Sequence, residues 1–212
     1  MTEDEAPEHG YEIRPLSGDT WDAYAALIER HNGGGFGGCW CCWFHNASVA
    51  EKREAGGGDW RAYKERLVRE GGAHAALVFD GEAAVAWAQF GSPEELPGIF
   101  HRKEVELPGE PWPDYRVTCI FVDRRYRRRG VAAMALDGAL RLISDAGGGL
   151  VEAYPQDTGG RKVSASFLYS ATRSMFSDAG FAYVRAKGKN HCIMRTTVPA
   201  PRRPSEPTAS GR

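Results

Sequence analysis

The chain has 212 residues, of which 42% are hydrophobic and 26% are charged. This is enough apolar material for the core of one globular domain, and we expect a single domain. The formal net charge is -1, so the chain lacks the positive field of a dedicated nucleic-acid binder, and small molecules are the expected partners. No apolar run approaches the roughly 20 residues that span a bilayer, and the first residues are acidic, unlike a signal peptide. These features predict a cytoplasmic protein without nucleic-acid or membrane contacts, and they leave monomer and homodimer open.

Both ends of the chain are expected to be disordered tails. Residues 1–10 are polar and acidic, and residues 198–212 are rich in Pro, Ser and Arg. Neither end carries enough apolar surface to order itself. The folded domain is therefore expected over residues 11–197.

The first half of the chain predicts a strand, two helices and a hairpin. Residues 11–15 alternate between apolar and charged side chains, as in a strand, and Asp19 is positioned to cap a helix with an apolar stripe. Asp59 precedes a second amphipathic helix that ends at two glycines. The apolar runs 75–79 and 83–90 enclose an Asp-Gly pair, which favours a tight hairpin turn.

The second half predicts a long loop followed by alternating strands and helices. Residues 91–114 contain five prolines, which indicates a loop that can cover a ligand. Residues 115–122 are rich in β-branched and aromatic side chains, as in a central strand, and 131–143 carry a helical stripe. The remaining elements are a strand at 150–154, a helix at 170–179, and strands at 181–186 and 192–196. The pattern is that of a mixed α/β domain.

A basic segment between the central strand and its helix has the features of an anion site. It contains Arg127, Arg128 and Arg129, followed by Gly130 at the start of the helix. The glycine allows a phosphate to approach, and the unpaired N–H groups and dipole of the helix N-terminus attract negative charge. We expect a pyrophosphate here; a solvated charged turn or a nucleic-acid patch is the alternative.

The same segment resembles the GNAT superfamily of acyl-CoA-dependent N-acyltransferases. The family motif is Arg or Gln, two residues, Gly, one residue, then Gly or Ala, and it is met by Arg127, Gly130 and Ala132. Met-Phe-Ser-Asp-Ala-Gly-Phe at 175–181 and Glu-Ala-Tyr-Pro at 152–155 are also similar to family members. The resemblance covers residues 11–196 and implies one domain with a central mixed, mostly antiparallel sheet flanked by helices.

Membership in this family implies acetyl-CoA as co-substrate and no metal. The resemblance places acetyl-CoA between the strands 115–122 and 150–154, with backbone groups near Phe121 and Val122 holding the pantetheine and thioester. The pyrophosphate would lie against Arg127, Arg128, Arg129, Gly130, Val131 and Ala132. A primary amine of a small molecule or peptide would attack the thioester directly in a ternary complex, with proximity and an oxyanion-stabilising N–H supplying the rate. A catalytically silent acyl-CoA-binding module is the alternative.

The sequence departs from the family at the general acid. Many members have a tyrosine that protonates the departing thiolate, whereas this chain has Phe176 at the matching position. Tyr154 and Tyr169 are the candidate replacements, and a buried core tyrosine is the alternative for each. The thiolate can also leave without a protein acid.

Two residues are candidates for the general base. Glu152 could accept a proton if its side chain points between the two strands. Side chains alternate between the two faces of a strand, so Glu152 lies on the face opposite Val151 and Ala153, and a surface glutamate is the alternative. His191, in the turn between the last two strands, is the other candidate, with an exposed loop histidine as its alternative.

The segment before Phe44 is rich in glycine, cysteine and tryptophan. Its G-x-G-x-x-G match at 33–38 follows a helix and not a strand, so it predicts flexible backbone and not a dinucleotide site. Trp40, Trp43 and Phe44, together with His191, are expected to line the acceptor site, with core packing as the alternative for the aromatic residues.

The cysteines of this segment are expected to be reduced thiols that border the acceptor pocket. Cys39, Cys42 and His45 are zinc-ligand types, but the sequence offers no clear fourth ligand, so we expect no metal. The chain has five cysteines, an odd number, which does not suggest a secreted disulfide framework. A zinc-stabilised interaction domain is the weaker alternative.

Overall fold

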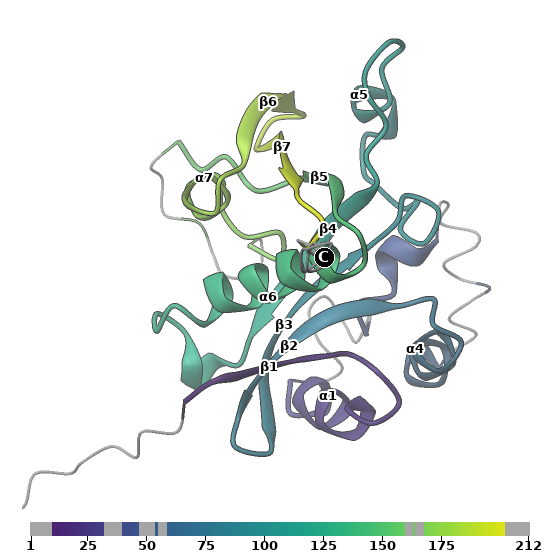
Figure 1. The fold of residues 1–212 in the computed structure, drawn as a ribbon, viewed down its shortest axis with the longest axis vertical. Coiled ribbons are helices and arrows are strands. Elements are labelled where there is room, and N and C mark those ends of the chain that lie inside the picture. The colour runs from purple at the N-terminus through teal and green to yellow at the C-terminus, as the bar shows by residue number, and fades with distance from the viewer. Residues whose placement is uncertain are drawn as a thin grey trace, which may run out of the picture.

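The structure, a computed structural model, describes residues 10–31, 40–46, 54, 59–159, 163 and 168–201. The described strands form one sheet in the order β1-β2-β3-β4-β5-β7-β6 (Figure 1). The strands are β1 (Glu12–Pro15), β2 (His74–Asp80), β3 (Ala83–Gly91), β4 (Tyr115–Val122), β5 (Gly149–Ala153), β6 (Ala182–Lys187) and β7 (His191–Val198). The α-helices are α1 (Trp21–Glu29), α4 (Trp60–Arg69), α5 (Arg102–Val105), α6 (Val131–Asp145) and α7 (Arg173–Asp178), with 3-10 turns at Trp43–His45 and Arg124–Tyr126.

The pairing of the strands confirms the expected mixed, mostly antiparallel sheet. Among the described strands, β4 and β5 form the one parallel pair, and all other neighbours are antiparallel. A parallel pair needs a crossover connection, and α6 supplies it. The predicted hairpin is also confirmed: β2 and β3 end with Asp80 opposite Ala83, and Gly81 takes the left-handed conformation (φ +59) that the turn requires.

Helices cover both faces of this sheet (Figure 1). On one face, α6 buries Leu136, Ala139 and Ile143, whose spacing of three and four residues forms a single apolar stripe. On the other face, α1 buries Trp21 and Tyr24, and α4 packs beside it. Two apolar layers therefore enclose the sheet and hold the ends of its strands in place.

Two helix starts differ from the sequence prediction. Thr20, and not Asp19, is the residue before α1, and its hydroxyl donates to the carbonyl oxygen of Pro15 (2.8 Å). The last helix begins at Arg173, later than expected, because Ala171 has a left-handed backbone (φ +57) and its carbonyl accepts from the N–H of Gln156 (3.0 Å). Residues 170–172 are thus tied to the chain that follows β5 and cannot continue the helix.

The predicted tails are only partly described. Residues 1–9 and 202–212 lie outside the described part of the chain. At the C-terminal side, Val198 belongs to β7, and the carbonyl oxygen of Pro199 accepts from the Ser144 hydroxyl (2.7 Å). The contacts of the domain therefore extend past residue 197. Among the described helices, none combines the length and apolar character needed to cross a membrane.

Candidate active site

The parallel strands β4 and β5 separate partway along β4. They pair over three positions that end with Val117 opposite Ala153, while β4 continues to Val122. The separation coincides with a β-bulge, because the pairing of β4 with β3 skips Thr118. Such bulges bend a strand and increase its twist. The result is a gap between the two strands, with the second half of β4 as one wall.

Backbone groups of Ile120 and Val122 face this gap. The N–H of Ile120 donates to the carbonyl oxygen of Tyr169 (2.7 Å), and the carbonyl oxygen of Val122 accepts from Arg127 Nε (3.3 Å). Backbone groups alternate in direction along an antiparallel pair, so those of Phe121 face β3, where Phe121 stands opposite Trp87. Ile120, and not the expected Phe121, therefore shares this edge with Val122.

A pocket opens beside the gap and gathers side chains from distant parts of the chain. It encloses about 240 Å³ of space that is open to solvent. Its lining residues are Phe44, Ile99, Phe100, Thr118, Tyr154, Tyr169, Ser170, Lys187 and His191. Four of these, Phe44, Tyr154, Tyr169 and His191, are candidates from the sequence, and the fold brings them together.

Several polar groups of the pocket lack a hydrogen-bond partner. The hydroxyls of Thr118 and Ser170 and the Nε2 atom of His191 are buried without one among the described residues. Buried polar groups are nearly always paired, so three exceptions in one pocket call for an explanation. Burial, followed by the charge of Lys187, lowers the pKa of His191, which keeps its imidazole neutral at neutral pH. A polar ligand would satisfy these groups.

Lys187 is the charged lysine of this pocket, and it is one of the lining residues that the sequence did not suggest. Its side chain is only 5% exposed, and its ammonium lies 5.2 Å from the centre of the Tyr154 ring. Burial lowers the pKa of Lys187 to about 8, although the charges of Glu104 and Glu152 oppose this. Within the described part of the chain, the ammonium makes no ion pair and no hydrogen bond. A lysine side chain is rarely buried without a paired anion.

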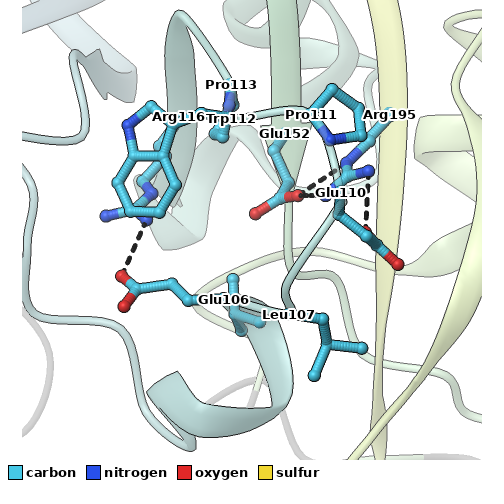
Figure 2. Close-up of a pocket in the computed structure, with 10 residues that line it drawn as sticks. Glu106, Leu107, Glu110, Pro111, Trp112, Pro113, Arg116, Glu152 and Arg195 are labelled. Carbon is cyan, nitrogen blue, oxygen red and sulfur yellow. Dashed lines mark hydrogen bonds and ion pairs between the residues drawn. The ribbon is translucent and has the colours of Figure 1, made fainter.

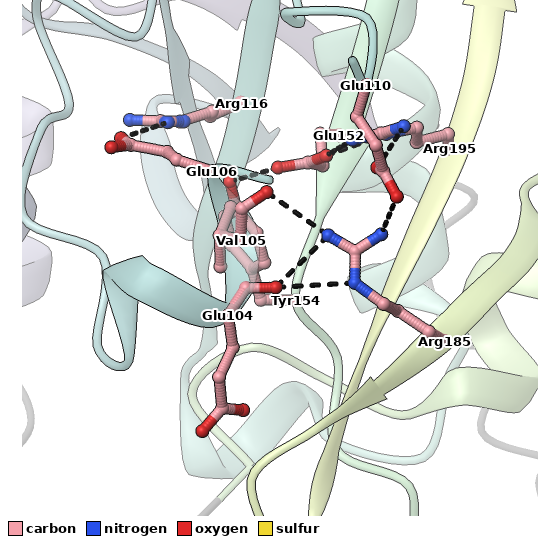
Figure 3. A network of polar contacts seen from close by, with 9 residues as sticks. All are labelled: Glu104, Val105, Glu106, Glu110, Arg116, Glu152, Tyr154, Arg185 and Arg195. Carbon is pink, nitrogen blue, oxygen red and sulfur yellow. Dashed lines mark hydrogen bonds and ion pairs between the residues drawn. The ribbon is translucent and has the colours of Figure 1, made fainter. Parts of the chain in front are cut away.

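Glu152 and Tyr154 are bonded to each other (Figure 3). The Tyr154 hydroxyl donates to one oxygen of Glu152 (2.5 Å), and Arg195 donates to the other through Nε (2.7 Å). Glu152 is 1% exposed, so the alternative of a surface glutamate is wrong. Burial, then the charge of Glu152, raises the pKa of Tyr154 well above its usual range. The carboxylate is already paired with Arg195 and the hydroxyl with the carboxylate, so neither is available as a free base or acid.

Tyr169 and Phe176 lie in different parts of the molecule. Tyr169 lies in the pocket wall, and burial raises the pKa of its hydroxyl. Phe176 is fully buried against Phe181, with ring centres 5.0 Å apart, and belongs to the core. Of the two candidate tyrosines, Tyr169 is thus the one whose hydroxyl is not committed to Glu152.

The loop before β4 is fixed by arginines from three strands (Figures 2 and 3). Glu110 pairs with Arg185 and with Arg195, the latter at 2.9 Å. Arg116 donates to the carbonyl oxygen of Leu96 (3.0 Å) and lies 3.6 Å from a carboxylate oxygen of Glu106. These contacts fix the proline-rich segment, which is a loop as predicted, with only the short helix α5 inside it.

The predicted anion site is open. Gly130 has a left-handed backbone (φ +76) and precedes α6 without a side-chain cap, and a Cβ atom there would meet nothing within 4 Å. Arg127, Arg128 and Arg129 are exposed around it. The Val131 side chain is buried in the core and Ala132 is partly buried, so these residues offer only their backbone N–H groups. The N-terminus of a 15-residue helix is thus accessible beside three cations.

Asp123 holds the turn that leads to this site. Its carboxylate accepts from the Arg125 N–H (3.0 Å) and guanidinium (2.8 Å). The Arg125 hydrogen bond, together with the Arg125 charge and His31, holds the pKa of Asp123 well below its usual range although burial opposes it. The carboxylate is therefore ionised at all physiological pH values, and it shapes the loop without entering the anion site.

The aromatic residues expected at the acceptor site divide between two locations. Trp40 is buried in the core and stacks on Trp21 at 6.0 Å, so its core alternative holds. Trp43 stacks on Phe100 at 5.8 Å and supports the pocket wall from behind. Phe44 lines the pocket itself. One of the three expected aromatic side chains is therefore in contact with the pocket.

The described cysteines are thiols that form no disulfide, of which Cys119 is partly buried and the others are buried, and none lines the pocket. Cys41 and Cys42 lie in the core beside α1, and Cys39 lies outside the described residues. Both nitrogens of His45 have partners, with Nδ1 at 3.0 Å from the carbonyl oxygen of Glu95 and Nε2 at 3.0 Å from Lys64 Nζ. In the described part of the chain, no three potential metal-ligating side chains converge.

Similarity to known proteins is found in the fold and not in the sequence. No protein-family model and no curated protein sequence matches the chain. Its fold matches a solved structure described as "histone acetyltransferase HPA2 and related acetyltransferase" from Corynebacterium glutamicum, with 10% identity over 92% of this chain and 99% of that chain and a TM-score of 0.50. It also matches an N-acetyltransferase from Staphylococcus aureus, with 8% identity over 89% of this chain and 98% of that chain and a TM-score of 0.50.

The chain therefore has the fold of the GNAT acetyltransferases, as residues 127–132 implied. At these identities the similarity extends to the fold alone. The acceptor must be inferred from the pocket.

Proposed function

We propose that this protein transfers an acetyl group from acetyl-CoA to a primary amine of a small molecule or peptide. The main support is the position of two open sites along β4. The anion site at Gly130 follows the C-terminal end of the strand, and the pocket with unpaired polar groups adjoins Thr118, about 13 Å back along the strand from Val122. An extended molecule with a pyrophosphate at one end and a thioester at the other would connect them.

The reaction needs an uncharged amine next to the thioester. The amine nitrogen attacks the carbonyl carbon, the C–N bond forms, the C–S bond breaks, and the proton lost by nitrogen ends on the CoA sulfur. His191 is the residue that we assign as base, because its Nε2 is neutral and unpartnered among the described residues. Tyr169 is the candidate proton donor to the thiolate, because it lines the same pocket.

Binding of CoA along β4 would require a local rearrangement. The N–H of Ile120, which a pantetheine carbonyl would need, now donates to Tyr169. We expect residues 168–171 to shift when acetyl-CoA binds. The same bond, together with Phe176 at the usual position of the acid, favours the second candidate, a module that binds acyl-CoA without turnover.

The decisive experiment is a screen of primary amines (amino acids, polyamines, aminoglycosides and peptide N-termini) for acetyl-CoA-dependent release of CoA thiol. Release with an amine and not without it supports the transferase. If acetyl-CoA raises the melting temperature and no amine releases thiol, the silent module is favoured.

Two glycine variants test the anion site separately. At 100 times its dissociation constant, acetyl-CoA should stabilise the protein by about 2.7 kcal/mol. Gly130→Glu should abolish this shift, because it places a negative charge beside the pyrophosphate. Gly71→Glu is the matched control, because Gly71 also has a positive φ (+73) and open space around it but follows α4. Equal shifts in both variants would show that the anion site is elsewhere.

A further inference from the structure

The acceptor pocket contains a positive charge without an anion to balance it. Lys187 ends β6 with a side chain that is 5% exposed and lines the pocket. Proteins bury a lysine ammonium rarely, and usually with a carboxylate, because the desolvation cost is large. Here the described residues provide no such partner.

The two acids whose charges act on Lys187 already have other hydrogen-bond partners. Glu152 accepts from Tyr154 and from Arg195. Glu104 accepts from the N–H of Gly188 (2.7 Å) and lies 3.6 Å from His101 Nδ1. The ring of Tyr154 offers Lys187 a weak cation–π contact at 5.2 Å, which does not replace an ion pair.

The unpaired groups around Lys187 are suited to the same kind of ligand. The hydroxyls of Thr118 and Ser170 can each donate one hydrogen bond, and Lys187 adds three donors and a charge. A carboxylate accepts up to about four hydrogen bonds and prefers charged donors. Phe44 and Ile99 provide an apolar wall for the body of such a ligand.

We propose that the acceptor is a small molecule that carries a carboxylate as well as the reacting amine, and that Lys187, with Thr118 and Ser170, binds this carboxylate. The substrate class is therefore that of free amino acids and their close analogues. This inference rests on the proposed function, because it treats the pocket as the acceptor site.

The test measures binding of product-like acids in the presence of CoA. The probes are the N-acetyl derivatives of the twenty standard amino acids, of β-alanine and of 4-aminobutyrate, each compared by calorimetric titration with the matching amide, in which the backbone carboxylate is replaced by a neutral group. In the wild type, at least one acid should bind ten or more times more tightly than its amide. Lys187→Met should remove this preference, and Lys187→Arg should keep part of it.

Lys189→Met is the matched control, because Lys189 is exposed two residues further along the same turn. It should retain the full preference for the acid. The inference is overturned if no acid is preferred over its amide in the wild type, or if Lys187→Met keeps the preference.

Turnover distinguishes this inference from the proposed function. If acids bind through Lys187 but no primary amine of the screen releases CoA thiol, the carboxylate site stands and the transferase proposal fails. If amines with and without a carboxylate react with equal kcat/KM, the transferase stands and the carboxylate site fails. If Lys187 binds the carboxylate, Lys187→Met should raise KM for the acceptor and change kcat little. If Lys187 were the base, the same variant would lower kcat for all amines.

Discussion

Two buried clusters of charge lie side by side in this protein, and they differ in how they are paired. Around Glu152, the acids are held in ion pairs: Arg195 bonds Glu152 and Glu110, and Arg185 bonds Glu110. Around Lys187, the ammonium makes no ion pair and no hydrogen bond, and three neighbouring polar groups are buried without a partner in the described part of the chain. The first cluster fixes the loop before β4, and the second is incomplete in a way that a ligand can correct. The two clusters are both buried, so their roles can be distinguished only by comparing the partners of their polar groups.

The largest effect should come from breaking the paired cluster. Arg195→Leu leaves the Glu152 carboxylate buried without its cation, which typically costs 3–5 kcal/mol. Urea unfolding measures this loss. Arg173→Leu removes an ion pair at the surface and should cost about 1 kcal/mol or less. Similar losses in the two variants would contradict the structural role of the buried cluster.

Substitution of the two tyrosines, Tyr169 and Tyr154, should have different effects on rate and on stability. Tyr169→Phe should lower kcat by a factor of ten or more if its hydroxyl protonates the thiolate. Tyr154→Phe should instead lower stability by about 1–2 kcal/mol, because it removes a donor to the buried Glu152. Steady-state rates and urea unfolding of both variants check this. A larger loss of rate in Tyr154→Phe would return Tyr154 to the catalytic role.

The pH dependence of acid binding should report the ionisation of Lys187. Its pKa in the free protein is about 8, set by burial against the opposing charges of Glu104 and Glu152. An anion needs the ammonium form, so affinity for an N-acetyl amino acid should be constant below this value and fall up to tenfold per pH unit above it. His191 stays neutral across this range, because its pKa is lowered. Lys187→Arg should remove the decline, because a guanidinium stays protonated. A decline that persists in Lys187→Arg belongs to another group.

The smallest effect should be a gain in stability. Lys187→Met removes an unpaired buried cation and keeps the length of the side chain, so we expect an increase of about 1 kcal/mol in the free energy of unfolding. The folded protein holds the proton of Lys187 less tightly than the unfolded chain, with pKa values of about 8 and 10.5. The ligand-free wild type should therefore gain stability as pH rises from 8 to 10.5, and the variant should lack this contribution. Chemical unfolding at several pH values tests both points, and a less stable variant would contradict them.

Local patterns in the sequence predicted the fold more completely than the site. Asp80-Gly81 and the flanking apolar runs predicted the hairpin, and residues 127–132 predicted an anion site at the start of α6, because each pattern depends on neighbours in sequence. Lys187 precedes Gly188, Lys189 and Asn190, so local sequence predicts an exposed turn. It lines a pocket together with residues 99 and 100 of the distant loop and lies against the ring of Tyr154, which no local pattern reveals.

The same limit explains Glu152 and Thr118. Period two correctly places the Glu152 side chain opposite Val151, but whether that face is covered depends on Arg195 and the loop at Glu110. Thr118 occupies a bulge inside an otherwise regular strand, and a bulge is a property of the register with β3. A hydroxyl in the middle of an apolar strand was the one local signal of this site.

The hydrogen bond between Ile120 and Tyr169 has a consequence for the order of events in a catalytic cycle. Ser170, which we assign to the carboxylate, follows Tyr169 directly in the chain. If CoA displaces the carbonyl of Tyr169 from Ile120, it must also move Ser170, so the two substrates cannot enter independently. Initial-rate measurements should then show a compulsory order in which acetyl-CoA binds first. A non-reacting analogue of the acceptor should be an uncompetitive inhibitor with respect to acetyl-CoA. Independent, random entry of the two substrates would mean that the segment moves without altering the pocket.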